Sequence, residues 1–148
     1  MSTTKRNKRA RKVVVVDREL FDLHDKRRSL LFEIVNRGIK LSTVEALEDN
    51  WRKIDILMDS TFSPMSLREY QGLSDKRSSY VLDDGYEYLL ERILDKLDRI
   101  VFEGMNAEDV KALHALDKQR KGLTRRADVL SKPIDVQKYL GTMGRRKS

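Results

Sequence analysis

The chain has 148 residues, enough for one domain with tails; 37% of them are charged and only 39% hydrophobic. It has no cysteine, which excludes disulfides, thiol nucleophiles and cysteine-ligated metal centres. Its longest aliphatic run, Val13 to Val16, is too short to span a bilayer, and no apolar segment makes the basic N-terminus a secretory signal. We therefore expect an intracellular protein, cytoplasmic or nucleoid-associated (nuclear if from a nucleated cell), that makes no membrane contact.

The formal net charge of +7 is unevenly distributed along the chain. Residues 1–12 carry six cations and no anion, residues 13–104 have a net charge of −5, and residues 105–148 have a net charge of +6. An acidic middle between two basic ends is typical of contact with nucleic acid or with a membrane surface. The N-terminal arm has no apolar residue larger than Met1 and Ala10, so we expect it to be disordered and unable to insert into lipid.

The pattern predicts an all-α domain over residues 13–140, followed by a disordered basic tail at residues 141–148. The four valines are the only strongly β-like stretch, and we expect them to form an extended lead-in because they are too few and too isolated for a sheet. The first helix is expected from Asp17, a suitable N-cap, to Arg37, with Gly38 at its C-terminal end.

Ser42 and Glu45 have the spacing of a capping box, which predicts the start of a second helix. Apolar residues then recur at spacings of three and four: Val44, Leu47, Trp51, Ile54 and Met58. This seam places Trp51 in the core rather than on a surface that stacks bases.

Residues 60–80 interrupt the helical pattern with serines, Pro64 and Gly72. We expect a long loop that is partly disordered or binds a partner, with a short helix around Ser66 to Tyr70.

The third helix is expected from about Leu82 to Glu103, and a fourth begins after the N-cap Asn106. The fourth helix carries an apolar stripe as far as Leu130 and ends before Pro133, and a short amphipathic piece, Ile134 to Leu140, follows. Short connections make the helices of each pair antiparallel, so the predicted fold is a bundle of about four helices built from two αα-hairpins. No internal sequence repeat is expected, and the heptad-like seams favour a homo-oligomer.

Catalytic and nucleotide-binding signatures are absent from the sequence. We interpret His24, between Asp22 and Asp25, as a surface histidine rather than a metal ligand, and His114 as partly buried and hydrogen-bonded. The pair Asp83-Asp84 is better explained as charge at a helix N-terminus. We therefore predict a protein that is not an enzyme and needs no cofactor or metal.

Tyrosines offer a weaker indication of function. Tyr86 lies on the seam of the third helix, whereas Tyr70, Tyr80 and Tyr139 lie outside the strong stripes and are freer to contact a ligand.

Three basic sets, at residues 5–12, 118–126 and 145–147, carry most of the functional information. Lys118, Lys121 and Arg125 are spaced to share one helix face, which suits either a nucleic-acid backbone or ordinary solvent. The candidate nucleic-acid-binding residues are Lys5, Arg6, Lys8, Arg9, Arg11, Lys12, Lys118, Lys121, Arg125, Arg126, Arg145, Arg146 and Lys147.

These observations favour a non-catalytic accessory or assembly protein that binds DNA or RNA through backbone phosphates with low sequence specificity. A helix-turn-helix reader is disfavoured because the second helix carries five acidic residues: Glu45, Glu48, Asp49, Asp55 and Asp59. The alternative is a protein–protein adaptor or a structural subunit of a larger assembly, with the acidic middle docking a basic partner.

Overall fold

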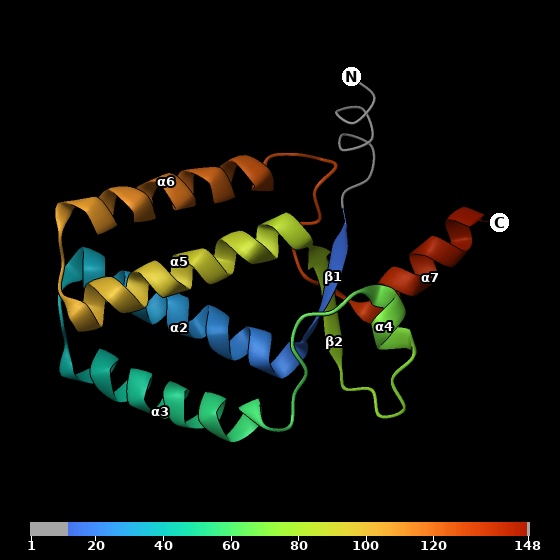
Figure 1. Cartoon of the computed structure of the whole chain (residues 1–148), viewed down its shortest axis with the longest axis horizontal. Coiled ribbons are helices and arrows are strands. Elements are labelled where there is room, and N and C mark those ends of the chain that lie inside the picture. Colours follow the sequence, from blue (N-terminus) through green and yellow to red (C-terminus); the bar gives the residue numbers. More distant parts are fainter. Residues whose placement is uncertain (1–11, 148) are drawn as a thin grey trace.

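The computed structural model describes the backbone of residues 12–147 and the side chains of residues 12–142 (Figure 1). This part of the chain contains six helices and a small sheet of three strands. The elements in chain order are β1 Val13–Asp17, α2 Arg18–Arg37, α3 Leu41–Met58, α4 Leu67–Gln71, β2 Ser79–Asp83, α5 Asp84–Glu103, α6 Ala107–Thr124, β3 Ile134–Asp135 and α7 Val136–Lys147.

The chain is mostly helical, as predicted, but the all-α prediction missed a small antiparallel sheet in the order β1-β2-β3. The valine run finds a partner in Ser79–Asp83, a segment that the sequence pattern divided between a loop and a helix. Both faces of this ribbon are covered: Val14 and Val16 face one apolar cluster and Val15 faces another. A strand buried on both faces is a continuous apolar run without alternation, which explains both its composition and its ambiguity in the sequence.

The chain folds as two copies of one unit, a first unit of residues 13–71 and a second unit of residues 79–147. Each copy has a strand, a 20-residue helix and an 18-residue helix, and each of these three elements begins 66 residues later in the second unit than in the first. A short strand-like segment and a further helix follow in both, since Met65 pairs with β1 before α4 and Ile134 pairs with β2 before α7. The expectation of no internal repeat is therefore wrong at the level of structure.

Sequence similarity between the units is confined mainly to the core, the caps and the turns. The same residue stands at eleven equivalent positions of the strands and long helices: Val15/Val81, Asp17/Asp83, Leu23/Leu89, Leu31/Leu97, Ile34/Ile100, Val35/Val101, Gly38/Gly104, Val44/Val110, Ala46/Ala112, Leu47/Leu113 and Leu57/Leu123.

The two units are related by an approximate two-fold axis at the centre of the ribbon, where Val15 lies opposite its own counterpart Val81. Helices α2 and α5 pack against each other, and α3 and α6 pack on their outer sides, so the long helices form a row in the order α3-α2-α5-α6 (Figure 1). The row buries a central cluster of Leu31, Leu47, Ile93, Leu97, Ile100 and Leu113. The two predicted hairpins are present, but they form an open row instead of a closed four-helix bundle.

Equivalent caps begin and end the inner helices. Asp17 accepts a hydrogen bond from Leu20 N (3.0 Å) and Asp83 accepts one from Tyr86 N (3.1 Å), so each strand leads directly into its helix. Gly38 and Gly104 end these helices with φ of 91° and 114°, a conformation that favours glycine. The predicted Asp17 cap, the Gly38 end and the Asn106 cap of α6 are confirmed.

Four boundaries differ from the sequence-based expectation. Helix α3 begins at Leu41, without a side-chain cap, and the capping box occurs in α4 between Ser66 and Glu69. The short helix expected around Ser66 to Tyr70 is present as α4, but the predicted loop at residues 60–80 also contains the start of β2. Helix α6 ends at Thr124, and the backbone of the predicted C-terminal tail is helical to Lys147.

Among the helices described, none has both the length and the apolar character that a membrane span needs.

Candidate functional site

Among the described residues, the basic arm begins at Lys12, whose carbonyl oxygen accepts a hydrogen bond from Asp84 N (2.9 Å). This contact fixes the root of the arm beside the start of α5 (Figure 1). Lys12 itself is exposed. The other predicted arm residues, Lys5, Arg6, Lys8, Arg9 and Arg11, lie outside the described residues.

The second predicted set lies at the C-terminal end of α6 and just beyond it. We call Lys118, Lys121, Arg125 and Arg126 the basic end of α6, and all four side chains are exposed. Leu123, in the same turn, packs against the cluster formed by Val14 and Val16 of the ribbon with Leu82, Tyr86 and Leu90, so this end of α6 lies on the side of the ribbon that Val14 and Val16 face. The root of the arm and the basic end of α6 therefore lie at the same end of the row of long helices (Figure 1).

Part of the positive charge at the basic end is neutralised internally. Lys121 lies 3.3 Å from Asp117, which also pairs with Arg120 at 2.9 Å, and Arg126 pairs with Asp128 at 2.6 Å. Lys118 and Arg125 make no ion pair with any residue that the structure describes. These two cations are the ones that an external anion can reach without competition.

The C-terminal set does not join this surface through its helix. Helix α7, which carries Arg145, Arg146 and Lys147, packs through Val136, Tyr139 and Leu140 on the Val15 side of the ribbon, opposite the side that α6 covers. The side chains of those three cations lie outside the described residues.

Two cations of the basic end have acidic counterparts in the first unit. In the first unit, acidic Asp55 and Asp59 stand where Lys121 and Arg125 stand in the second. The fold accommodates either sign at these positions, so the cations are not required for folding.

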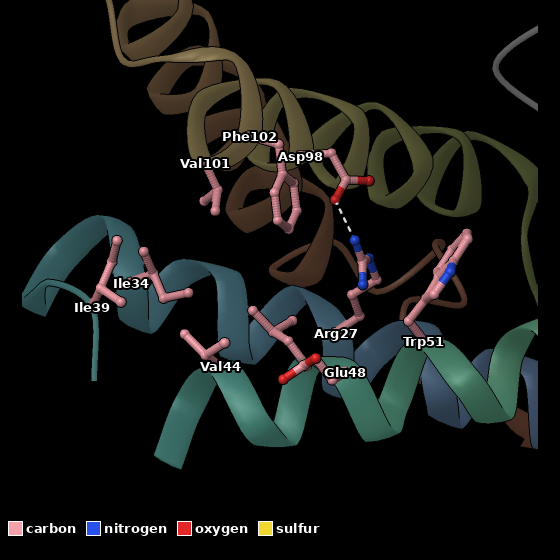
Figure 2. A pocket seen from close by; sticks show the side chains of 10 residues that line it. Arg27, Ile34, Ile39, Val44, Glu48, Trp51, Asp98, Val101 and Phe102 are labelled. Atoms are coloured by element: carbon pink, nitrogen blue, oxygen red, sulfur yellow. Dashed lines mark hydrogen bonds and ion pairs between the residues drawn. The ribbon is translucent and has the colours of Figure 1, made fainter. Parts of the chain in front are cut away.

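A groove of about 620 Å³ opens between α3 and α5, with α2 at its floor (Figure 2). Arg27 lies in it, 2.8 Å from Asp98 and with its guanidinium over the rings of Trp51 (5.2 Å) and Phe102 (5.8 Å). Trp51 and Phe102 point into the groove from opposite walls and are 52% and 63% exposed. The remaining lining is mainly apolar: Ile34, Ile39, Val44, Leu47 and Val101, with Glu48 on the α3 wall.

Placing Trp51 in the core was therefore wrong. Leu47 and Ile54 of the predicted seam are buried, but the other two buried side chains of α3 are Thr43 and Asn50, which precede the seam residues Val44 and Trp51. Asn50 turns inward because its amide donates to the carbonyl oxygen of Leu23 (2.9 Å), which leaves Trp51 at the groove. In the sequence, Lys26, Arg27 and Arg28 interrupt the apolar residues of α2, and this interruption is the one sequence signal for the groove.

The structure also places the tyrosine and histidine candidates. Tyr70 is buried and donates to the carbonyl oxygen of Arg77 (2.8 Å), so it is not free to bind a ligand, and Tyr86 is buried as predicted.

His24 is partly buried, and this burial, together with the charges of Arg28 and Arg27, lowers its pKa. His114 is exposed rather than buried. Within the described residues, no group of three histidines or carboxylates is arranged to hold a metal ion.

Glu87 is the most strongly perturbed acid of the fold. Burial against α2 raises its pKa to about 7, and the nearby carboxylates of Glu91 and Asp84 contribute in the same direction, while Arg28 opposes the shift. Its folded-state pKa thus lies above the ordinary value of 4.5.

We expect Glu87→Gln to stabilise the protein at pH 8 and to have little effect at pH 4. Between about pH 4.5 and 7 the unfolded chain releases the Glu87 proton while the folded chain retains it, so this group's contribution to stability falls as the pH rises. The gain at pH 8 should be about 1–2 kcal/mol, less than the full shift implies because the carboxylate is partly exposed. Urea denaturation of both proteins at pH 4, 6 and 8 measures the difference, with exposed Glu45→Gln as control. A difference that does not vary with pH would contradict the assignment.

No family model matches the sequence, and neither the search of curated proteins nor the search of solved structures found a match.

Proposed function

We propose that the protein is a non-catalytic nucleic-acid-binding accessory or assembly protein that contacts backbone phosphates with low sequence specificity. The observation that supports this is that the arm root at Lys12 and the basic end of α6 lie at the same end of the row of long helices. Two basic segments more than 100 residues apart in the sequence are thereby directed to one side of the fold.

The physical basis is electrostatic. Eleven residues precede Lys12, and an extended chain of that length reaches about 35–40 Å, enough to follow several phosphates of a duplex. Lys118 and Arg125 would contact the same polymer from the folded surface, with Lys121 and Arg126 exchanging their internal carboxylates for phosphates.

Low sequence specificity is expected because neither the ribbon nor α3 offers a surface suited to reading a groove. A β-ribbon that reads a groove needs side chains exposed on one face, and β1 and β2 are covered on both. The acidic surface of α3 would be repelled by phosphate.

A protein–protein adaptor or structural subunit is the second candidate, and the apolar groove between α3 and α5 favours it. Homo-oligomerisation stays a prediction, which sedimentation velocity of the full chain tests directly.

The test is a fluorescence-anisotropy titration of the full chain with duplex DNA, single-stranded DNA and RNA between 50 and 200 mM salt. We expect the affinity for duplex to fall by about a thousandfold over this range if about six phosphates are neutralised. Deleting residues 1–11 should remove most of this dependence of affinity on salt. Lys118→Ser with Arg125→Ser should lower the slope of log affinity against log salt by about two.

The first unit supplies a matched control. Arg52→Ser with Lys53→Ser removes the same two charges from α3, where Arg52 is the counterpart of Lys118, and should leave the slope unchanged. Equal losses in the two double variants would mean that only net charge matters, against an interface on α6. Absence of binding at 50 mM salt would exclude the proposal.

A further inference from the structure

The groove between α3 and α5 leaves two large aromatic rings, those of Trp51 and Phe102, facing solvent, whereas the core side chains pack in three buried clusters. Trp51 and Phe102 line it together with Ile39, which is also largely exposed. Contiguous exposed apolar surface of this kind marks an interaction site in a folded protein.

The internal repeat provides a comparison that separates this feature from the needs of the fold. In the equivalent place between α6 and α2, Asp117 stands where the first groove has Trp51, and Asn36 stands where it has Phe102. Both counterparts are polar, as expected of positions that face solvent. The fold thus forms without aromatic rings at these positions, and their presence in one groove alone calls for a binding role.

The inner positions differ in the opposite sense. At the second site, the equivalent place between α6 and α2, Ile93 stands where the groove has Arg27, and Phe32 stands where it has Asp98. The second site is therefore apolar inside and polar at its rim. The first groove instead has an apolar rim and an ion pair inside, with 39% of the Asp98 side chain still exposed. A carboxylate exposed within an apolar groove is an anchor for a cation on the occupant.

The two helices that form the walls of the groove carry a net negative charge. Helix α3 carries four acidic and two basic side chains, and helix α5 carries six acidic and three basic ones. Glu48 lines the groove from the α3 wall. An occupant with basic flanks would be attracted to both walls, and one with acidic flanks would be repelled.

Two occupants from the same sequence fit poorly. A second copy docked groove to groove would bring acidic walls against acidic walls. The arm of the same chain has the required positive charge but no apolar residue beyond Met1 and Ala10 to fill an apolar groove.

We infer that this groove binds an amphipathic helix of a partner protein, with an apolar stripe seated between Trp51 and Phe102 and lysine or arginine flanks facing Asp98 and Glu48. Helices α2, α3 and α5 form the groove, and the partner helix would complete a four-helix bundle with them. This inference is independent of nucleic-acid binding, because the groove lies between α3 and α5 and the basic end lies on α6.

Trp51 is the only tryptophan in the chain and reports directly on the groove. The probe is a synthetic helical peptide of about 18 residues, five turns, with leucines at spacings of three and four, lysine flanks and no aromatic residue. We expect a saturable blue shift of the Trp51 emission with a dissociation constant in the micromolar range. A peptide with the same leucines and glutamate flanks should produce none.

Phe102→Asn places at position 102 the residue that the second site has, and it should weaken binding at least about tenfold. The matched control is Tyr88→Asn, an equally exposed aromatic on α5 outside the groove, which should change the affinity by less than about twofold. Circular dichroism establishes that both variants fold, and neither should alter the salt dependence of nucleic-acid binding.

Three results would overturn the inference: no saturable shift with the lysine-flanked peptide, equal binding of the two peptides, or equal losses in the two variants. A dimer of the unmodified protein that Phe102→Asn converts to monomer would identify a second copy as the occupant and would also overturn it.

Discussion

Leu97→Ala is expected to lower the free energy of unfolding by about 3–4 kcal/mol, the largest effect of any single truncation considered for this fold. Leu97 is fully buried on α5 and belongs to the central cluster, in which α2, α3, α5 and α6 all take part. Truncation removes the transfer free energy of the side chain and leaves a cavity between inner helices that are held by the ribbon and cannot close around it.

The repeat makes this prediction sharper, because Leu31, the counterpart of Leu97 on α2, is equally buried. Leu31→Ala should cost the same within about 1 kcal/mol, and the double variant should depart from additivity since both residues belong to one cluster. Urea denaturation gives the values, with exposed Ile56→Ala as the control. A loss below about 1 kcal/mol in either single variant would contradict the packing described for α2 and α5.

Asp17→Ala is expected to destabilise the protein by about 2–3 kcal/mol. The Asp17 carboxylate is buried at the junction of β1 and α2, where it caps the helix at Leu20 N and also accepts a hydrogen bond from Arg77 Nε. Arg77 lies just before β2, so this one side chain connects the start of α2 with the entry to the second unit. Alanine removes the cap and the ion pair together.

Asp17→Asn separates the two contributions. Asparagine caps helices about as well as aspartate, so this variant should retain the cap, lose the ionic contact and cost less than half as much. Thermal or urea denaturation at neutral pH compares the three proteins, and Asp55→Ala, an exposed aspartate on α3, controls for loss of charge alone. Equal destabilisation by alanine and asparagine would show that the cap contributes nothing measurable.

The helices were predictable because their signals are local. Apolar residues at spacings of three and four, an aspartate before the first turn and a glycine after the last placed α2 within a residue of its observed bounds. Helix α5 was displaced by two residues at its start, because Leu82 is apolar and fits a helix stripe as well as it fits a strand.

The sheet and the repeat were not predictable in the same way. A run of four valines becomes a strand only when a partner is available, and its partner lies 66 residues away in a segment rich in serine. The two units share identities mainly at core, cap and turn positions, while exposed positions differ even in charge, as Asp55 and Lys121 do. Similarity confined to buried positions is hard to distinguish in a single sequence from the ordinary recurrence of leucine and valine.

The candidate site residues also divide into those that local sequence indicates and those that only the folded chain brings into place. The basic sets were visible as composition, but only the folded chain places Lys12 at the same end of the helix row as the basic end of α6, with α7 on the other side of the ribbon. The groove was hidden because Trp51 fits the predicted seam, and the polar Asn50 that displaces it reads as a surface residue. Its buried position depends on one hydrogen bond to another helix, which periodicity does not encode.

The pairing of β1 with β2 has a consequence for the order in which the protein folds. Each helical hairpin is closed by a turn of a few residues and can form on its own within microseconds, whereas joining Val15 to Val81 must close a loop that contains the whole first unit. The transition state for folding should therefore contain both hairpins already formed and the ribbon still open. The four valines, which the local sequence leaves without a partner, are then among the last residues to find their places.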